Sequence, residues 1–156
     1  MLVVTWDNFQ DLAWDFNNFT PQELLKASHY GSFIWSKKLE DTMLGLDLLR
    51  DTLGAPIMVS NACRFRGSET SQHFFRSPFN AIDIYNPKLS SLELMEYVEK
   101  LNIFTGRGAY FDTNNGIVHV DTRRGLRDKT NGRVSRWYRD KNGRYHTVTT
   151  FSEIKT

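Results

Sequence analysis

The sequence has few of the features that cross-link a small domain or hold a chain in a membrane. It contains a single cysteine, Cys63, so no internal disulfide can form. No apolar run approaches the roughly 20 residues that a membrane-spanning helix needs. The opening residues, MLVVTWDNFQ, lack the basic segment and the long apolar stretch of a signal peptide. We therefore expect no membrane span, no signal peptide and synthesis in the cytoplasm.

The excess of charge is small as well. The formal net charge is +2, so bulk charge does not call for a nucleic-acid partner, and we expect none. Basic residues nonetheless crowd the last quarter of the chain, with few acids between them: Arg123, Arg124, Arg127, Lys129, Arg133, Arg136, Arg139, Lys141 and Arg144. A solvated face is the simpler interpretation of this stretch. Contact with an anionic polymer, such as nucleic acid, teichoic acid or a membrane surface, is the alternative.

What is present suits one folded domain. A chain of 156 residues with 40% hydrophobic side chains can bury a core without cross-links. No repeat or low-complexity linker divides it. We expect a monomer with a single domain over residues 1–156, made of a core over about 16–124 and a basic C-terminal hairpin over 125–156. The aromatic-rich segment 1–19 is expected to pack on the core rather than to form a sugar-stacking platform.

Three helices are indicated. The first begins at Thr20 with a capping box and ends near Gly31. The main helix covers 36–53, where apolar residues recur at steps of three and four. The third covers 90–101 and again begins with a capping box.

Short β-rich runs indicate a sheet. Strands are expected at 56–60, 81–85, 106–110 and 116–122, and a hairpin over 134–151 turns at Asn142-Gly143. Gly106-Arg107-Gly108 is too short for a phosphate-binding loop, so its glycines are interpreted as turn residues. Together these elements predict an α+β fold with a small, mainly antiparallel sheet on which the helices pack.

Three residues have the chemistry of a metal site. Two imidazoles, His73 and His119, and one carboxylate, Asp83, suit Zn²⁺ and leave an open position for water. Asp83 and His119 both lie in apolar strands, where a polar group is costly unless it is paired or bound to a cation. The alternation of a strand also places Asp121 on the same face as His119.

Other reactive or aromatic residues have simpler interpretations. Cys63 could act as a nucleophile, but nothing near it in the sequence indicates an activated thiol. His29 and His146 are assigned to a helix end and to the hairpin surface. Trp137 and Tyr138, flanked by arginines, could stack on bases or glycans, and cross-strand packing in the hairpin explains them equally well.

Several segments resemble the M15 family of zinc peptidases, which comprises D-Ala-D-Ala carboxypeptidases and murein endopeptidases and shares its fold with the Hedgehog signalling domain. The resemblance covers roughly residues 16–124. It depends on the segments Ser60–Arg64, Ser71–His73, Ala81–Ile84, Gly106–Tyr110 and Val118–Arg123.

The resemblance implies roles for individual residues. His73, Asp83 and His119 would be the ligands of Zn²⁺, and Ser71 would be the small hydroxyl beside the first ligand, in contact with substrate. Arg64 would bind the substrate carbonyl and stabilise its oxyanion. The substrate would be a peptidoglycan stem peptide, and the protein would act at the bacterial cell wall or in the periplasm. The compact chain and the lack of a signal peptide favour a phage lysis or virion-associated enzyme.

The chain departs from the family pattern at three places. Asp83 follows His73 by ten positions, whereas seven are usual, and Ala62-Cys63 replaces the usual Gly-Tyr before the arginine. Gly116 stands where many members carry the acidic general base. Asp121 is therefore predicted to be the base, with Glu69 and Asp112 as further candidates. The alternative function is an inactive binding module on the same fold, contacting wall polymer, nucleic acid or a partner protein.

Overall fold

The computed structural model describes residues 2–127 and 133–154. Lys129 of the basic stretch lies outside the described residues. The elements, in chain order, are β1 (Leu2–Thr5), η1 (Phe9–Asp11), α1 (Pro21–Ala27), η2 (His29–Gly31), β2 (Ser32–Trp35), α2 (Lys37–Leu53), β3 (Met58–Asn61), β4 (Ala81–Tyr85), α3 (Ser91–Leu101), β5 (Gly106–Tyr110), β6 (Val118–Asp121), β7 (Ser135–Arg139), β8 (Tyr145–Val148) and η3 (Phe151–Glu153).

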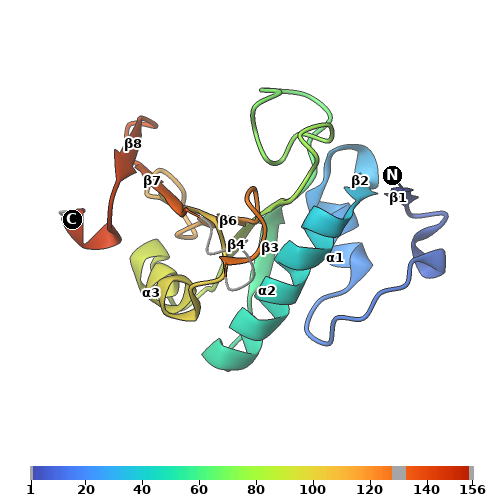
Figure 1. Ribbon diagram of the computed structural model, residues 1–156, viewed down its shortest axis with the longest axis horizontal. Coiled ribbons are helices and arrows are strands. Elements are labelled where there is room, and N and C mark those ends of the chain that lie inside the picture. Colours follow the sequence, from blue (N-terminus) through green and yellow to red (C-terminus); the bar gives the residue numbers. More distant parts are fainter. Residues whose placement is uncertain (1, 128–132, 155–156) are drawn as a thin grey trace.

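The main sheet has six strands in the order β3-β4-β6-β5-β7-β8. Every neighbouring pair is antiparallel except β5 and β7, which run parallel. Strands β1 and β2 form a separate antiparallel pair. The predicted α+β fold with a mainly antiparallel sheet is confirmed. The hairpin β7–β8 continues the main sheet, as Figure 1 shows.

The helices begin where their capping residues predict. In α1, Glu23 accepts a hydrogen bond from the backbone N–H of Thr20 at 2.7 Å, which closes the capping box. This helix ends at Ala27, earlier than predicted, and a short 3-10 turn leads into β2. Helix α2 ends at Leu53 and is capped by Gly54, which has the left-handed φ of 64° that glycine adopts without strain.

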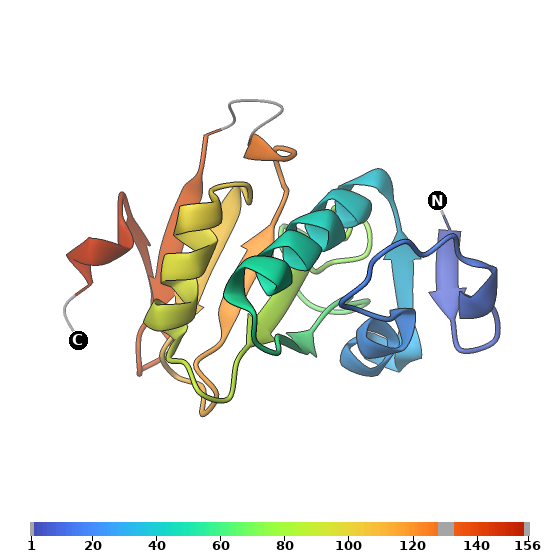
Figure 2. The same cartoon turned by 90° about the horizontal axis from the view of Figure 1, so that it is seen from below.

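Helices α2 and α3 cover one face of the main sheet (Figures 1 and 2). The core lies between them and the sheet, and its strand residues include Ile82, Ile84, Val118 and Val120, all fully buried. Because side chains alternate along a strand, Asp83 and His119 point to the opposite face, which these helices leave open.

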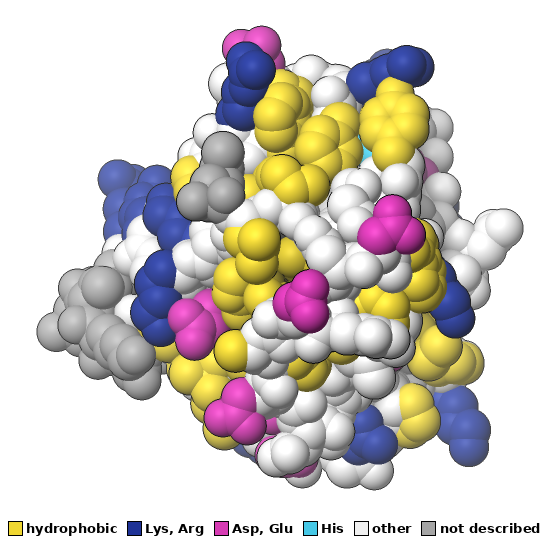
Figure 3. All heavy atoms as spheres, turned by 90° about the vertical axis from the view of Figure 1, so that its right-hand side faces the viewer, with side chains coloured by type: hydrophobic (Ala, Val, Ile, Leu, Met, Phe, Trp, Pro, Cys, Tyr) yellow, Lys and Arg dark blue, Asp and Glu magenta, His cyan; other side chains and the backbone are white. Residues whose placement is uncertain are grey.

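The N-terminal aromatic segment packs on the core, as expected. Trp14 donates its ring N–H to the carbonyl of Phe19 at 2.7 Å and lies against Trp35, with ring centroids 5.4 Å apart. Figure 3 shows that the surface on this side keeps patches of hydrophobic side chains among scattered charges. Tyr30 and Trp6 are among the exposed ones.

The two glycines of Gly106-Arg107-Gly108 are not turn residues, which corrects the prediction. Both lie in β5 and are buried. A Cβ on Gly106 would come within 2.2 Å of the Asp121 carboxylate, and one on Gly108 within 2.5 Å of the Trp137 ring. The glycines are therefore needed because two neighbouring side chains occupy the space above β5. On the other face, Arg107 is fully buried and pairs with Glu99.

Several arginines of the basic stretch form ion pairs with acidic side chains. Arg123 pairs with Asp121, Arg136 with Glu99 and Arg139 with Asp112. These three arginines are thus part of the packed structure, whereas the simpler interpretation placed the whole stretch on a solvated face. Among the described residues, no helix combines the length and the apolar character needed to cross a bilayer.

Candidate metal centre

A single row of residues crosses the main sheet at the site. The strand register pairs Asn61 with Asp83, Asp83 with His119, and His119 with Gly108. The row continues from Gly108 to Trp137. Adjacent strands lie about 4.8 Å apart, so this register brings side chains from four separate parts of the chain together.

His73 joins Asp83 and His119 from the loop that follows β3. Its Nε2 lies 3.0 Å from Oδ1 of Asp83 and 3.1 Å from Nδ1 of His119, and the same Oδ1 lies 3.0 Å from that Nδ1. All three residues are buried. The structure therefore brings together the three residues that the sequence singled out as metal ligands.

The ten-residue step from His73 to Asp83 is absorbed by a loop that is closed at its base. The backbone N–H of Asn80 donates to the carbonyl of Gln72 at 3.0 Å, and the side-chain amide of Asn80 donates to Oε1 of Gln72 at 2.9 Å. These two hydrogen bonds hold the ends of the loop together, so the longer spacing does not separate the two candidate ligands.

The second nitrogen of each imidazole is already engaged. Nδ1 of His73 lies 2.7 Å from the carbonyl oxygen of Ala62, which can only accept, so this nitrogen carries a proton. Nε2 of His119 lies 2.8 Å from Oδ2 of Asp121 and donates to that carboxylate. In the neutral rings, the remaining lone pairs on Nε2 of His73 and Nδ1 of His119 both point at Oδ1 of Asp83.

Asp121 lies behind His119 and is fully buried. The backbone N–H and the guanidinium of Arg123 both donate to its carboxylate, with Nη2 at 2.7 Å from Oδ2. Burial would raise the pKa of Asp121, but the hydrogen bonds and charges of His119 and Arg123 hold it well below its usual range. The carboxylate thus contacts the far nitrogen of His119 and not the three converging atoms.

The charge of His119 follows from these neighbours. Burial disfavours the imidazolium, but hydrogen bonds to Asp121 and Asp83 and the charges of both carboxylates outweigh it and raise the pKa of His119 to about 9. Without a metal, the centre therefore holds a proton on His119 at neutral pH. Burial also opposes ionisation of Asp83, yet the two histidines keep its pKa well below the usual range.

Comparison with family models gives a match to the Peptidase M15 model over residues 17–121. The chain belongs to the M15 peptidase family. Comparisons with curated proteins and with solved structures give no significant match. The matched segment of this M15 peptidase contains His73, Asp83 and His119 and ends at Asp121, before the hairpin β7–β8 begins.

The three atoms of the M15 site fit a small tetrahedral ion. Ligands about 2.0–2.2 Å from Zn²⁺ stand somewhat over 3 Å from one another in a tetrahedron, close to the separations of 3.0 and 3.1 Å found here. Two neutral imidazoles and one carboxylate also form the donor set of many hydrolytic zinc sites. The cluster His73–Asp83–His119 can therefore hold a metal ion.

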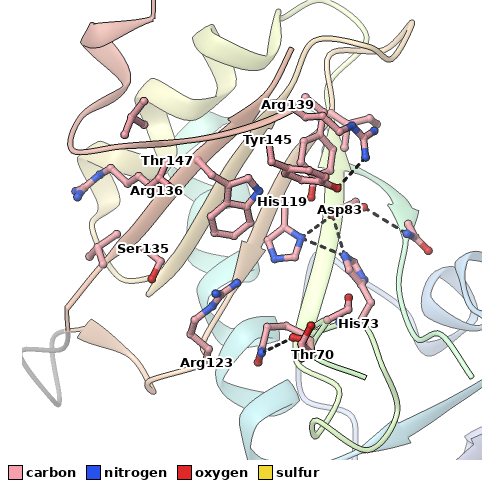
Figure 4. A pocket seen from close by; sticks show the side chains of 18 of the residues that line it. Thr70, His73, Asp83, His119, Arg123, Ser135, Arg136, Arg139, Tyr145 and Thr147 are labelled. Carbon is pink, nitrogen blue, oxygen red and sulfur yellow. Dashed lines mark hydrogen bonds and ion pairs between the residues drawn. The ribbon is translucent and has the colours of Figure 1, made fainter. Parts of the chain in front are cut away.

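A cavity of about 1190 Å³ is lined by the three candidate ligands of this peptidase, His73, Asp83 and His119. Arg64 and Ser71, to which the resemblance gives substrate contacts, line it on the side of the loop after β3, and Ser71 Oγ accepts the backbone N–H of His73 at 3.2 Å. The hairpin β7–β8 lines the opposite side (Figure 4).

Carboxylates are scarce around this cavity. Among the described residues, Asp83 and Glu153 are the ones that line it. Glu69 and Asp112, the further candidates for a general base, are not part of that lining, and Asp112 is paired with Arg139 at 2.7 Å. The candidate metal centre of this M15 peptidase is therefore surrounded mainly by cationic and hydroxyl side chains.

Sequence reasoning missed the contribution of Trp137. Its ring lies over Gly108 with its centroid 5.0 Å from that of His119, and the guanidinium of Arg123 lies 4.9 Å from the indole. The sequence suggested stacking on bases or glycans or cross-strand packing in the hairpin, and neither interpretation placed Trp137 beside His119. The strand-forming Gly-Arg-Gly was the signal available, because glycines in a buried strand indicate close approach of another group.

The other histidines and the cysteine stay outside the centre. His29 accepts the backbone N–H of Phe65 through Nδ1, and His146 pairs with Asp140 in the hairpin. Burial raises the pKa of the Cys63 thiol to about 12. Cys63 therefore has the properties of a packing residue and not of a nucleophile.

Proposed function

We propose that this M15 peptidase is zinc-dependent and hydrolyses a peptide bond in peptidoglycan stem peptides. The observation that carries the proposal is the convergence of two histidine lone pairs and one carboxylate oxygen on one point at the floor of a cavity. Bound at that point, Zn²⁺ would act as a Lewis acid and lower the pKa of a water molecule to about 7. We further propose a monomer that acts at the bacterial cell wall or in the periplasm, in phage lysis or as part of a virion.

Side chains that line the cavity would bind the substrate and stabilise the charge on its carbonyl oxygen. Arg64 lines it and makes no side-chain hydrogen bond or ion pair within the described residues, so its guanidinium is available for the carbonyl oxygen of the scissile bond. Burial, followed by the charge of Asp83, raises the pKa of Tyr110 well above its usual range, so this phenol stays protonated and can donate. Ser71 holds the backbone of His73 and borders the substrate.

We assign Asp121 a positioning role in place of the general-base role that its sequence position suggested. Its carboxylate contacts Nε2 of His119 and is clamped by Arg123, so it fixes the tautomer and the direction of the imidazole. A carboxylate that lies behind a ligand and is fully buried is badly placed to take a proton from water in the cavity.

A second candidate function is a metal-binding module that has lost catalysis. The observation that favours it is Gly116, which occupies the usual place of the acidic base. Its φ is +62°, and a Cβ there would lie 2.8 Å from the backbone nitrogen of Ser91. This position cannot accept a carboxylate without rearrangement, so catalysis must proceed without that group if it occurs.

Digestion of purified peptidoglycan by the zinc-loaded protein separates the two functions. We expect wild type to release new amine groups and His73→Ala to release none. His146→Ala, which removes a histidine outside the centre, is the matched control and should retain activity. If wild type releases no amine groups under any metal supplement while it binds zinc, the binding module is the correct function.

A further inference from the structure

The hairpin β7–β8 forms the wall of the cavity that lies beyond the metal centre. It is joined to β5 at one edge of the sheet, whereas Arg64 follows β3 at the other edge. Arg139, Tyr145 and Thr147 from this hairpin line the cavity. The family match ends before these residues, so family membership assigns them no role.

The guanidinium of Arg139 is held in place but not saturated. Its Nε donates to Oδ1 of Asp112 at 2.7 Å, and its Nη1 donates to the hydroxyl of Tyr145 at 3.1 Å. A guanidinium has five N–H donors, so donors remain, and the side chain is 24% exposed. Asp112 thus orients the group, and its free edge is available to a ligand in the cavity.

This cluster adjoins the metal centre. The guanidinium of Arg139 lies 4.3 Å from the ring centroid of Tyr110, and that ring lies 6.4 Å from the ring of His119. Figure 4 shows Arg139 and Tyr145 joined by a hydrogen bond on the same side of the sheet as His119 and Asp83. A peptide bound at the metal would therefore reach Arg139 within a small number of residues.

The chemistry of this wall favours a ligand that accepts hydrogen bonds. The polar groups that line this side of the cavity include guanidiniums and hydroxyls, from Arg123, Arg133, Ser135, Arg139, Tyr145, Thr147 and Thr149, beside the apolar Val134, Trp137 and Val148. Among the described residues that line the cavity on this side, the one carboxylate is Glu153, and it already accepts the backbone N–H groups of Thr149 and Thr150. Arg123 and Arg139 each pair with a carboxylate outside the cavity lining, Asp121 and Asp112. The N–H donors that these pairs leave free favour an anion in the cavity.

We propose that Arg139 and Tyr145 form a subsite for a carboxylate of the peptide substrate. The inference rests on the proposed peptidase function and names the substrate class as a peptide that carries a free carboxylate near the scissile bond. In a stem peptide this carboxylate has two sources, the α-carboxylate of a γ-linked D-Glu and the C-terminal carboxylate.

Four synthetic stem peptides test the subsite and distinguish the two sources. Each carboxylate is either free or converted to its amide, and binding to the zinc-loaded protein is measured by calorimetry, with KM and kcat added where cleavage occurs. We expect amidation of one of the two carboxylates to weaken binding by about 10- to 100-fold. We expect Arg139→Gln to bind the acid and the amide equally.

Two further variants show whether a loss of binding in Arg139→Gln comes from the subsite or from misfolding. Tyr145→Phe removes one exposed hydroxyl, and we expect it to reduce the preference for the acid by roughly two- to tenfold without changing Tm. Arg144→Gln removes the same charge at the exposed tip of the hairpin, outside the cavity lining, and should keep the full preference.

The test distinguishes failure of the subsite from failure of the proposed peptidase function. If wild type binds the diamide as tightly as the diacid, or binds none of the four peptides, the subsite is overturned. The same holds if Arg139→Gln and Tyr145→Phe both keep the wild-type preference. If wild type prefers the acid but cleaves no peptide, the subsite stands and only the peptidase function fails.

Discussion

Nε2 of His119 donates a hydrogen bond to Oδ2 of Asp121 at 2.8 Å, and this contact determines which nitrogen of the ring is left for a metal. Because the carboxylate keeps the ring proton on Nε2, the lone pair of the neutral ring is on Nδ1, beside Asp83. Arg123 in turn holds the carboxylate from the other side. The geometry of the centre thus depends on residues that are not themselves ligands.

Asp121→Asn should weaken zinc binding by about 10- to 100-fold, because an amide neither carries the charge nor fixes the tautomer of His119. Competition with a chromophoric chelator measures the affinity. Asp140→Asn is the matched control, since Asp140 also lies 2.8 Å from a histidine, His146, but away from the centre. Equal affinities of Asp121→Asn and wild type would show that Asp121 has no positioning role.

Zinc binding should release a proton from His119 at neutral pH. The pKa of His119 is raised to about 9 in the metal-free protein, so Nδ1 must lose its proton before the ring can bind the metal while Nε2 still donates to Asp121. Calorimetry in buffers of different ionisation enthalpy counts the protons. We expect the share from His119 to be close to one at pH 7 and to disappear as the pH rises above about 9. A proton count that does not change over this range would contradict the assignment.

The same shift affects the stability of the metal-free protein. The folded-state pKa of His119 lies above its ordinary value of 6.5, so the imidazolium stabilises the fold fully below pH 6.5. This contribution is lost as the pH rises through about 9. Urea unfolding of the metal-free protein at pH 6 and pH 10 measures it, and the difference should be smaller in His119→Gln.

Gly108→Ala should destabilise the fold by about 1–3 kcal/mol, because the new methyl overpacks against Trp137. The added Cβ would lie 2.5 Å from the indole. In a Trp137→Ala background the same change should cost less, and urea unfolding of the four proteins gives the coupling. Additive losses in this cycle would show that Trp137 does not occupy the space above Gly108.

Cys63 should not react in the native protein. Its side chain is fully buried and the pKa of its thiol is raised to about 12, so almost no thiolate forms at pH 8. We expect a thiol reagent to modify it only after denaturation, and Cys63→Ala to keep any peptidase activity. Rapid, stoichiometric labelling of the folded protein would contradict this expectation and reopen a nucleophilic role for the thiol.

Local sequence signals predicted much of the fold. The capping residues Thr20 and Ser90 mark the starts of α1 and α3, and Gly54 marks the end of α2, because these preferences act over only a few residues. The strands β1 and β2 were not predicted, since a short strand is stable only with its partner, and that partner lies some 30 residues away in the sequence.

The sequence by itself determined the donor set of the centre. His73, Asp83 and His119 have the chemistry of zinc ligands, and the alternation of a strand places Asp121 on the face of His119 whatever the rest of the fold does. Alternation specifies a face but not the direction of a side chain. Only the tertiary structure turned Asp121 toward the far nitrogen of His119, because Arg123 and the space above Gly106 decide where its carboxylate fits.

The tertiary structure alone also decided what the basic hairpin does. Its parallel pairing with β5 places Trp137 against His119 and Arg139 at the cavity, although both residues follow the last candidate ligand by many positions. Sequence patterns report which faces are apolar and which turns are tight. They do not report which strand edge a hairpin will join, since that depends on long-range packing that no local preference encodes.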